Sequence, residues 1–233
     1  MLEVTETLAT EESLDSIDLK SLAAEVVAAA QKAGATDAEA VVSEGDEFSV
    51  SVRMGEVETL QESGSRGLGL RVFLGTRSAS TSTSDLTADG VRQLVEGAVA
   101  LAKVTEEDPF TGLPETSAFG ALTNNLHLYY DDVYSLAGPE RIDWARRCEA
   151  AALAADPRIT NSDGGSFDAA TGRKVMANSR GFVGSYRTSY AGVSAAPLAM
   201  DTDGKMQRDG WWSGARRMAD LESPEAIGKE AVT

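Results

Sequence analysis

The sequence contains few of the residues from which catalytic and metal centres are usually built. Among its 233 residues there is one histidine, His127, and one cysteine, Cys148. A Ser-His-Asp triad or a Cys-His pair would have to use His127, and one histidine with one cysteine makes a poor zinc site. We therefore assign no catalytic, cofactor-binding or metal-ligating residue to this chain, and we expect no cofactor in it.

Basic residues are also scarce. The chain has 21 Lys and Arg against 37 Asp and Glu, which gives a formal net charge of −16. Such a charge repels nucleic-acid phosphates, so we expect no direct nucleic-acid partner. The single cysteine excludes an internal disulfide and fits a reducing compartment. The sequence has neither an apolar run of membrane-spanning length nor a signal-peptide layout, and we expect a cytoplasmic protein without a membrane partner.

Known phosphate-binding motifs are absent as well. In Gly64-Ser-Arg-Gly67-Leu-Gly69 the glycine spacing of the dinucleotide fingerprint is reversed and a strand pattern follows, and no Gly-x-x-x-x-Gly-Lys-Ser/Thr occurs. His127 lies between Leu126 and Leu128, which is more typical of a packed or half-exposed strand residue than of a ligand. These patterns therefore give no nucleotide site.

Three further features have a structural and a functional interpretation. Asp131-Asp132 could be a metal or acid–base pair, but neighbours in a strand face opposite ways, and we interpret them as a solvated edge. Cys148 lies among alanines in a predicted helix, which favours a small buried side chain over a reactive thiol. For Trp211-Trp212, packing in a core or an interface is favoured over a stacking platform.

The strongest periodicity lies between Phe48 and Leu86, where apolar and polar residues alternate. Short connections there favour an antiparallel meander. We expect Gly67 and Gly69 to mark a close backbone approach or a bulge, so that Gly69→Val costs about 1–3 kcal/mol through overpacking or strain. The expected elements, in order, are a strand at 48–53, a turn at Met54-Gly55-Glu56, a strand from Val57, a break at 64–67, a strand at 68–74 and a polar outer strand at 78–84.

Helix signals surround this meander. Asp18 is placed to cap a helix that Gly34 ends, a second helix follows Thr87, and Pro139 opens a third. A last helix starts at Ser223-Pro224 and meets no cap before the final residue, so we expect it to lead into an absent C-terminal domain. Further strands are predicted at 38–43, 127–130, 158–161, 165–169, 174–178 and 182–200.

Together these elements predict an α+β fold of antiparallel β-sheets flanked by helices. The two parts of the chain show the same order of elements, and Ser65-Arg66-Gly67 is matched by Ser179-Arg180-Gly181, so two related helix-plus-meander halves are one interpretation. The expected organisation is a flexible acidic N-terminus at 1–17, a first half at 18–105, a connecting loop at 106–125, a second half at 126–222 and the start of a helix at 223–233.

Two stretches rich in Ser, Thr and Gly, 76–84 and 184–196, are candidate sheet edges. An open edge can accept an extended peptide as an additional strand. An edge covered by another part of the full protein is an equally good interpretation, and the sequence leaves both open.

Several segments in a fixed order resemble the TldD/PmbA family, and the similarity is greatest to its PmbA (TldE) branch. The resemblance spans roughly residues 18 to 233 and corresponds to the N-terminal region of a family member. The segments are Gly-Leu-Gly-Leu-Arg-Val at 67–72, Ser84-Asp85-Leu86, Asp108-Pro109, Ala155-Asp-Pro-Arg-Ile-Thr-Asn-Ser-Asp-Gly-Gly-Ser-Phe167, Ala177-Asn-Ser-Arg-Gly181 and Met206-Gln-Arg-Asp-Gly210.

The resemblance implies a dimeric metalloprotease acting on extended or unfolded peptides, including peptide-antibiotic precursors and antitoxins, in a family historically called modulator of DNA gyrase. In such a pair the TldD-type partner holds the metal, expected to be zinc, through His-Glu-x-x-x-His. This chain lacks that motif. We therefore expect a supporting subunit that pairs with a TldD-like protein or with itself and helps to enclose peptide. The alternative is a non-catalytic regulatory module that binds gyrase or a toxin–antitoxin partner.

Overall fold

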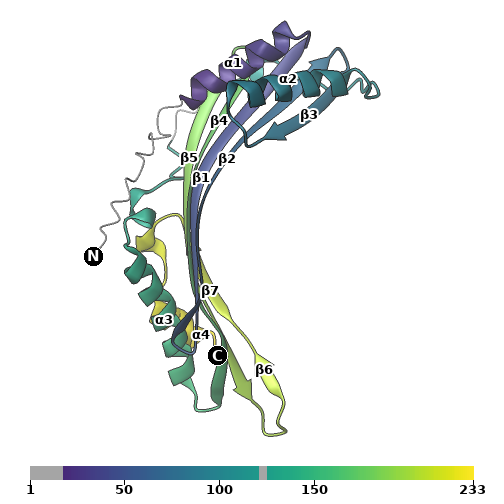
Figure 1. Ribbon diagram of the computed structural model, residues 1–233. Helices are drawn as coiled ribbons and strands as arrows, with labels where there is room; N and C mark the ends of the chain where they lie inside the picture. Colours follow the sequence, from purple (N-terminus) through teal and green to yellow (C-terminus); the bar gives the residue numbers. More distant parts are fainter. Residues whose placement is uncertain (1–17, 121–124) are drawn as a thin grey trace, which may run out of the picture.

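The computed structural model describes residues 18–120 and 125–233. It confirms the α+β class, and both groups of predicted strands belong to one antiparallel sheet of seven strands. The strand order is β3-β2-β1-β4-β5-β6, and β7 also pairs with β5. Figure 1 shows that the long strands bend strongly, with α1 and α2 at one end of them and α3 and α4 at the other.

The element bounds are as follows. The helices are α1 (Leu19–Lys32), α2 (Ala88–Ala102), α3 (Gly138–Ala155) and α4 (Pro224–Glu230), with 3-10 turns η2 (Thr116–Ala118), η3 (Asp131–Tyr134) and η4 (Met218–Asp220). The strands are β1 (Asp37–Arg53), β2 (Glu56–Leu74), β3 (Arg77–Thr83), β4 (Ile159–Asn178), β5 (Val183–Met200), β6 (Met206–Arg208) and β7 (Trp211–Ala215).

The strands are longer than the sequence patterns predict. The expected break at 64–67 is wrong, because Gly64 and Gly67 pair with Asp46 and Ser43 of β1 in an unbroken register. The segments predicted at 38–43 and 48–53 are likewise one strand, β1. The three strands predicted at 158–161, 165–169 and 174–178 form one strand, β4. Its pairing with β5 shifts register near Ser162. Pairing with β1 keeps these glycines and polar residues extended, which their local sequence does not specify.

Other element predictions also need correction. The segment 127–130 is irregular rather than a strand, and His127 has a positive φ of 52°. Helix α4 ends at Glu230, before the last residues of the chain. The two Ser-Arg-Gly triplets lie in different structures, since Arg66 is inside strand β2 and Arg180 follows strand β4. The triplets therefore do not support a repeat.

The turn between β1 and β2 agrees with its prediction. It contains Met54 and Gly55, whose φ angles of 51° and 81° are those of the two-residue hairpin that matches strand twist. A buried carboxylate from α3 holds this turn. Glu149 accepts hydrogen bonds from the backbone N–H of Met54 at 2.8 Å and of Gly55 at 2.9 Å. The α3 layer therefore fixes the tip of the first hairpin.

The α1/α2 layer packs through apolar side chains. The Asp18 carboxylate caps α1 by accepting from the Lys20 N–H, as the sequence predicts. The Thr87 hydroxyl caps α2 by accepting from the Gly90 N–H. These helices cover the ends of β1, β2 and β4. The buried residues of this core include Leu19, Val26, Val42, Leu68, Leu70, Val72, Leu94, Val99 and Val175.

The α3/α4 layer covers the same face of the sheet at the other end. The buried residues of β1 have even numbers in both cores, and side chains two apart along a strand share a face. Unlike the first layer, this one includes buried charge. Arg141 is 5% exposed, and its guanidinium lies over the rings of Phe48 and Tyr134 at 4.7 and 4.4 Å from their centroids.

The opposite face of the sheet carries small and polar residues, with aromatic side chains lying over glycines of β5 and β7. The Tyr190 hydroxyl oxygen lies 2.7 Å from where a Cβ would stand on Gly192 and 3.0 Å from that position on Gly214. The tryptophan pair is not packed in a core, because Trp212 on β7 is 67% exposed. A ring placed over a glycine covers backbone that has no side chain of its own.

Candidate functional site

Between the two helical layers the described residues leave the sheet uncovered and form a groove of about 720 Å³, which we call the central groove. Its charged side chains extend from the same face of the sheet as the helices, because they continue the numbering of the buried residues on each strand. The groove is lined by Glu44, Gly45, Asp46, Gly64, Ser65, Arg66, Ser84, Thr171, Gly172, Arg173 and Arg187.

A single row of charged residues crosses the central groove. Strand register places Arg66, Glu44, Arg173 and Arg187 side by side on β2, β1, β4 and β5. Glu44 lies 3.9 Å from Arg173, at the limit of an ion pair. Arg187 lies over the Tyr129 ring, 3.5 Å from its centroid, and donates to the Tyr129 hydroxyl. The central groove thus contains three arginines, although the net charge of the chain is strongly negative.

The sheet also has open edges. The predicted edge at 76–84 is largely strand β3, which is paired only with residues 68–74 of β2. The predicted edge at 184–196 is partly covered, because β7 pairs with Ala191–Ala195. Before that stretch, the Ser189 N–H donates to the Leu128 carbonyl oxygen at 2.9 Å. Only the first part of β5 therefore remains an edge.

A longer edge lies on β2. Residues Glu56–Gly67 extend beyond β3, and within the described part of the chain β1 is the only strand that pairs with them. Nearly all of these residues are exposed. Sequence reasoning missed this edge because it divided the strand at its glycines. The signal that could have found it is length, since β2 has 19 residues and β3 only seven.

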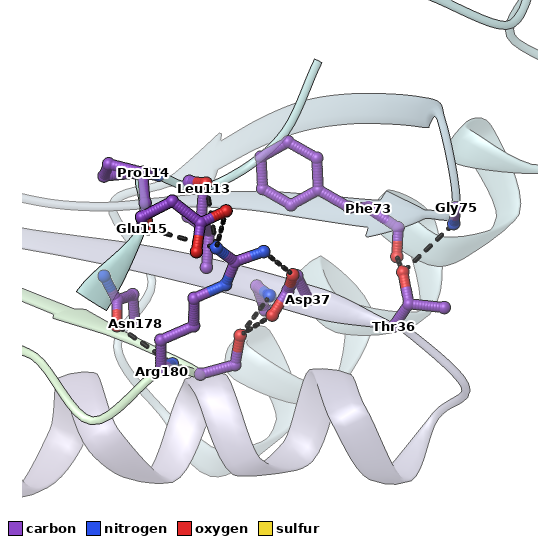
Figure 2. A network of polar contacts seen from close by, with 11 residues as sticks. Thr36, Asp37, Phe73, Gly75, Leu113, Pro114, Glu115, Asn178 and Arg180 are labelled. Carbon is purple, nitrogen blue, oxygen red and sulfur yellow. Dashed lines mark hydrogen bonds and ion pairs between the residues drawn. The ribbon is translucent and has the colours of Figure 1, made fainter. Parts of the chain in front are cut away.

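A network of polar contacts fastens one end of the sheet (Figure 2). The Asp37 carboxylate, at the start of β1, accepts from the Ser179 hydroxyl at 2.6 Å and from Arg180 at 3.0 Å. Arg180 also donates to the carbonyl oxygens of Leu113 and Pro114, each at 3.1 Å. Although burial acts to raise the pKa of Asp37, the hydrogen bonds from Ser179 and Arg180 hold it below its usual value. The network joins the start of β1, the β4–β5 turn and the loop between α2 and α3. Its role is therefore structural.

The residues singled out in the sequence do not come together. His127 is exposed in its loop, with its ring stacked on Tyr130 at 6.4 Å between centroids. Cys148 is fully buried, and burial raises the pKa of its thiol to about 12, as expected of a packed rather than a reactive cysteine. Across residues 18–120 and 125–233 there is no group of three His, Cys, Asp or Glu that could hold a metal ion.

The acidic pair is not the predicted solvated edge. Asp131 and Asp132 begin the 3-10 turn η3, and one Asp132 carboxylate oxygen accepts from the backbone N–H of Met218 at 3.0 Å. Its other oxygen is buried and has no hydrogen-bond partner among the described residues. Asp132 therefore fastens the segment after β7 to the start of the α3 layer, and the prediction failed because this segment is a turn rather than a strand.

Comparisons with known proteins place both parts of the chain in one family. The model of the PmbA/TldA metallopeptidase domain 1 matches residues 38–102, and the model of the PmbA/TldA metallopeptidase central domain matches residues 131–233. The metalloprotease PmbA of Escherichia coli O157:H7 is 34% identical over 195 residues, which are 84% of this chain and 43% of that protein. A PmbA homologue of Haemophilus influenzae is 34% identical over 215 residues, 92% of this chain and 47% of the relative.

Solved structures share the fold. A proposed modulator of DNA gyrase from Bacteroides thetaiotaomicron superposes with a TM-score of 0.85 at 23% identity, over 91% of this chain and 48% of that one. TldE from Thermococcus kodakarensis gives a TM-score of 0.75 at 14% identity, over 91% and 46%.

The chain spans less than half the length of these relatives. A metallopeptidase family implies a metal ion, but the described residues of this chain offer no fitting donor set for one. None of the described helices is both long and apolar enough to cross a bilayer. With both matched domains in their expected order, this chain belongs to the PmbA/TldA metallopeptidase family and corresponds to its N-terminal region.

Proposed function

We propose that this chain forms part of a PmbA/TldE-like supporting subunit, which aligns or encloses an extended peptide while a TldD-type partner carries the metal, expected to be zinc. The observation that supports this role is the open edge of β2 at Glu56–Gly67. An extended peptide can add to such an edge through hydrogen bonds between the two backbones, which do not depend on the side chains of the peptide. That suits substrates that are unfolded and varied.

The chemistry of amide hydrolysis explains why the proposal assigns peptide binding to this chain and catalysis to a TldD-type partner. The reaction requires an activated nucleophile and groups that stabilise the developing oxyanion. His127 and Cys148 do not form an activated nucleophile together, because His127 lies in an exposed loop and Cys148 is buried. The expected contribution of this chain is therefore binding and orientation of peptide.

The test is a peptidase assay on an unfolded peptide with purified full-length proteins. The peptide is mixed with the full-length protein alone, with a TldD-type partner alone, and with both, and the last mixture is repeated with a chelator. Chelator-sensitive cleavage should require both proteins. Cleavage by this protein alone that survives a chelator and repurification would contradict the proposal.

A matched pair of variants tests the edge itself. Leu60→Lys places a charge on the open part of β2, where Leu60 is 50% exposed, whereas Leu101→Lys does the same on α2, where Leu101 is 45% exposed. The edge variant should raise KM for a long unfolded peptide, because a lysine on an edge opposes strand addition. The helix variant should leave KM unchanged, and equal effects of the two would remove the edge from the mechanism.

A further inference from the structure

The central groove contains an arrangement that sheet formation alone does not favour. Arg173 of β4 and Arg187 of β5 are directly opposite each other in the antiparallel register. Like charges at such positions destabilise a sheet. The single acid in their row, Glu44, reaches Arg173 at 3.9 Å and is on the far side of it from Arg187. A bound anion would relieve this repulsion.

The charges that line the groove favour an acidic ligand. Arg66, Arg173 and Arg187 outnumber the two acidic side chains of the lining, Glu44 and Asp46. Arginine binds carboxylates well because its planar guanidinium presents two parallel donors. The groove volume of about 720 Å³ is that of a site for several side chains rather than for one small ion.

The chain itself carries a segment of matching charge, which directly precedes α1 in the sequence. Residues 1–17, which the structure does not describe, include five acidic residues and no lysine or arginine: Glu3, Glu6, Glu11, Glu12 and Asp15. They continue directly into Asp18, the N-cap of α1. The pKa of the Asp18 carboxyl is lowered mainly by a hydrogen bond from Ser21, and the charge of Arg173 also lowers it. Seventeen residues span up to about 60 Å when extended, so reach does not limit them.

We propose that the acidic segment 1–17 binds in the central groove, with its carboxylates on the arginine row of Arg66, Arg173 and Arg187. The linkage to Asp18 makes this binding intramolecular, which raises the effective concentration of the segment without any new contact. The groove is then a carboxylate-binding site that the protein's own N-terminus occupies. This inference is independent of the proposed peptidase role.

Binding of a synthetic peptide tests the proposal. The probe is a fluorescent peptide with the sequence of residues 1–17, and the proteins are the full-length protein and the same protein lacking residues 1–17, which keeps the Asp18 cap. Fluorescence anisotropy at low salt should show binding to the shortened protein and at least about fivefold weaker binding to the intact one, because the tethered segment competes. Equal affinity for the two proteins, or no binding to the shortened one, would overturn the proposal.

Charge substitutions in the shortened protein locate the site. Arg173→Gln with Arg187→Gln should weaken binding at least about fivefold. The matched control, Arg92→Gln with Arg158→Gln, removes the same charge from exposed residues that already pair with Asp89 and Asp156. Glu44→Gln should act in the opposite direction and tighten binding. If both double variants weaken binding equally, the attraction is general and the groove is not the site.

A control peptide decides whether the segment's sequence matters. Changing its five acidic residues to Gln and Asn should abolish binding. An unrelated peptide of equal charge should bind the shortened protein less tightly than the native segment does, and if it binds as tightly, the groove takes acidic peptides in general and the proposed occupant is wrong. Circular dichroism of each variant confirms that it is folded.

Discussion

The two helical layers cover one face of one sheet in different ways. The α1/α2 layer buries a single cluster of apolar side chains, among them Val26 and Leu70. The α3/α4 layer also buries apolar side chains, among them Phe167 and Ile227. In addition it buries two charged residues, Arg141 and Glu149, and brings backbone close to backbone at its glycines. Both layers therefore depend on apolar volume, and the second depends in addition on buried hydrogen bonds and on the absence of side chains at its glycines.

The close contacts of the second layer occur at two glycines. A methyl group on Gly165 of β4 would overlap the carbonyl oxygen of Ala145 in α3, and one on Gly228 of α4 would overlap that of Cys148. No side chain can move aside there, because the obstructing atoms are backbone. Packing in this layer therefore requires that Gly165 and Gly228 have no side chain, a requirement that adds to the burial of apolar side chains.

The largest effect should come from Glu149→Ala. The substitution leaves the N–H groups of Met54 and Gly55 without their acceptor and should destabilise the fold by about 3–5 kcal/mol. Glu149→Gln keeps one acceptor oxygen and should cost less. Chemical denaturation measures both, with Glu96→Ala on the exposed face of α2 as the control. A loss of less than about 1 kcal/mol would show that α3 does not hold the first hairpin.

In the first layer, Leu70→Ala should cost about 2–4 kcal/mol, because it removes apolar volume from a side chain that is 1% exposed. Leu70→Met keeps the volume and should cost under about 1.5 kcal/mol. The midpoint of urea unfolding reports both. A similar loss for the two variants would contradict the view that volume alone governs this layer.

Gly165→Ala should destabilise by about 1–3 kcal/mol through overlap with Ala145. Gly69→Ala is its control on the same sheet, since a Cβ there would lie 3.9 Å from the Val41 carbonyl oxygen, an ordinary contact. The expected cost of the control is within about 0.5 kcal/mol. This corrects the close approach that the sequence suggested at Gly69. Equal costs for both glycines would show that the close approach to Ala145 is not what makes Gly165 necessary.

The smallest effect at neutral pH should come from the Cys148 thiol in the second layer. Its pKa of about 12 in the folded protein exceeds the ordinary value of 9.0, because burial disfavours the thiolate. The stabilisation is complete below pH 9 and is lost as the pH rises from 9 towards about 12. Relative to Cys148→Ala, the protein should therefore lose stability only in this range. If no stability were lost between pH 9 and about 12, the thiol would be solvated, because its pKa would then be the same in the folded and the unfolded protein.

Much of the local structure is predictable from the sequence. The caps at Asp18 and Thr87, the start of α3 near Pro139 and the turn at Met54-Gly55 all follow from side chains that act on their own neighbours. The family is also evident from the order of short segments. These signals are local, so they survive without knowledge of the rest of the fold.

By itself the sequence determined the α+β class, the antiparallel pairing, the helices and their caps, because each depends on periodicity or on one residue near a chain break. Only the tertiary structure decided that two groups of strands form one sheet and that β2 continues through Gly64 and Gly67. It also decided that Arg173 and Arg187 lie side by side on neighbouring strands in the central groove. Strand register is a relation between residues far apart in the chain, and no single stretch of sequence contains it.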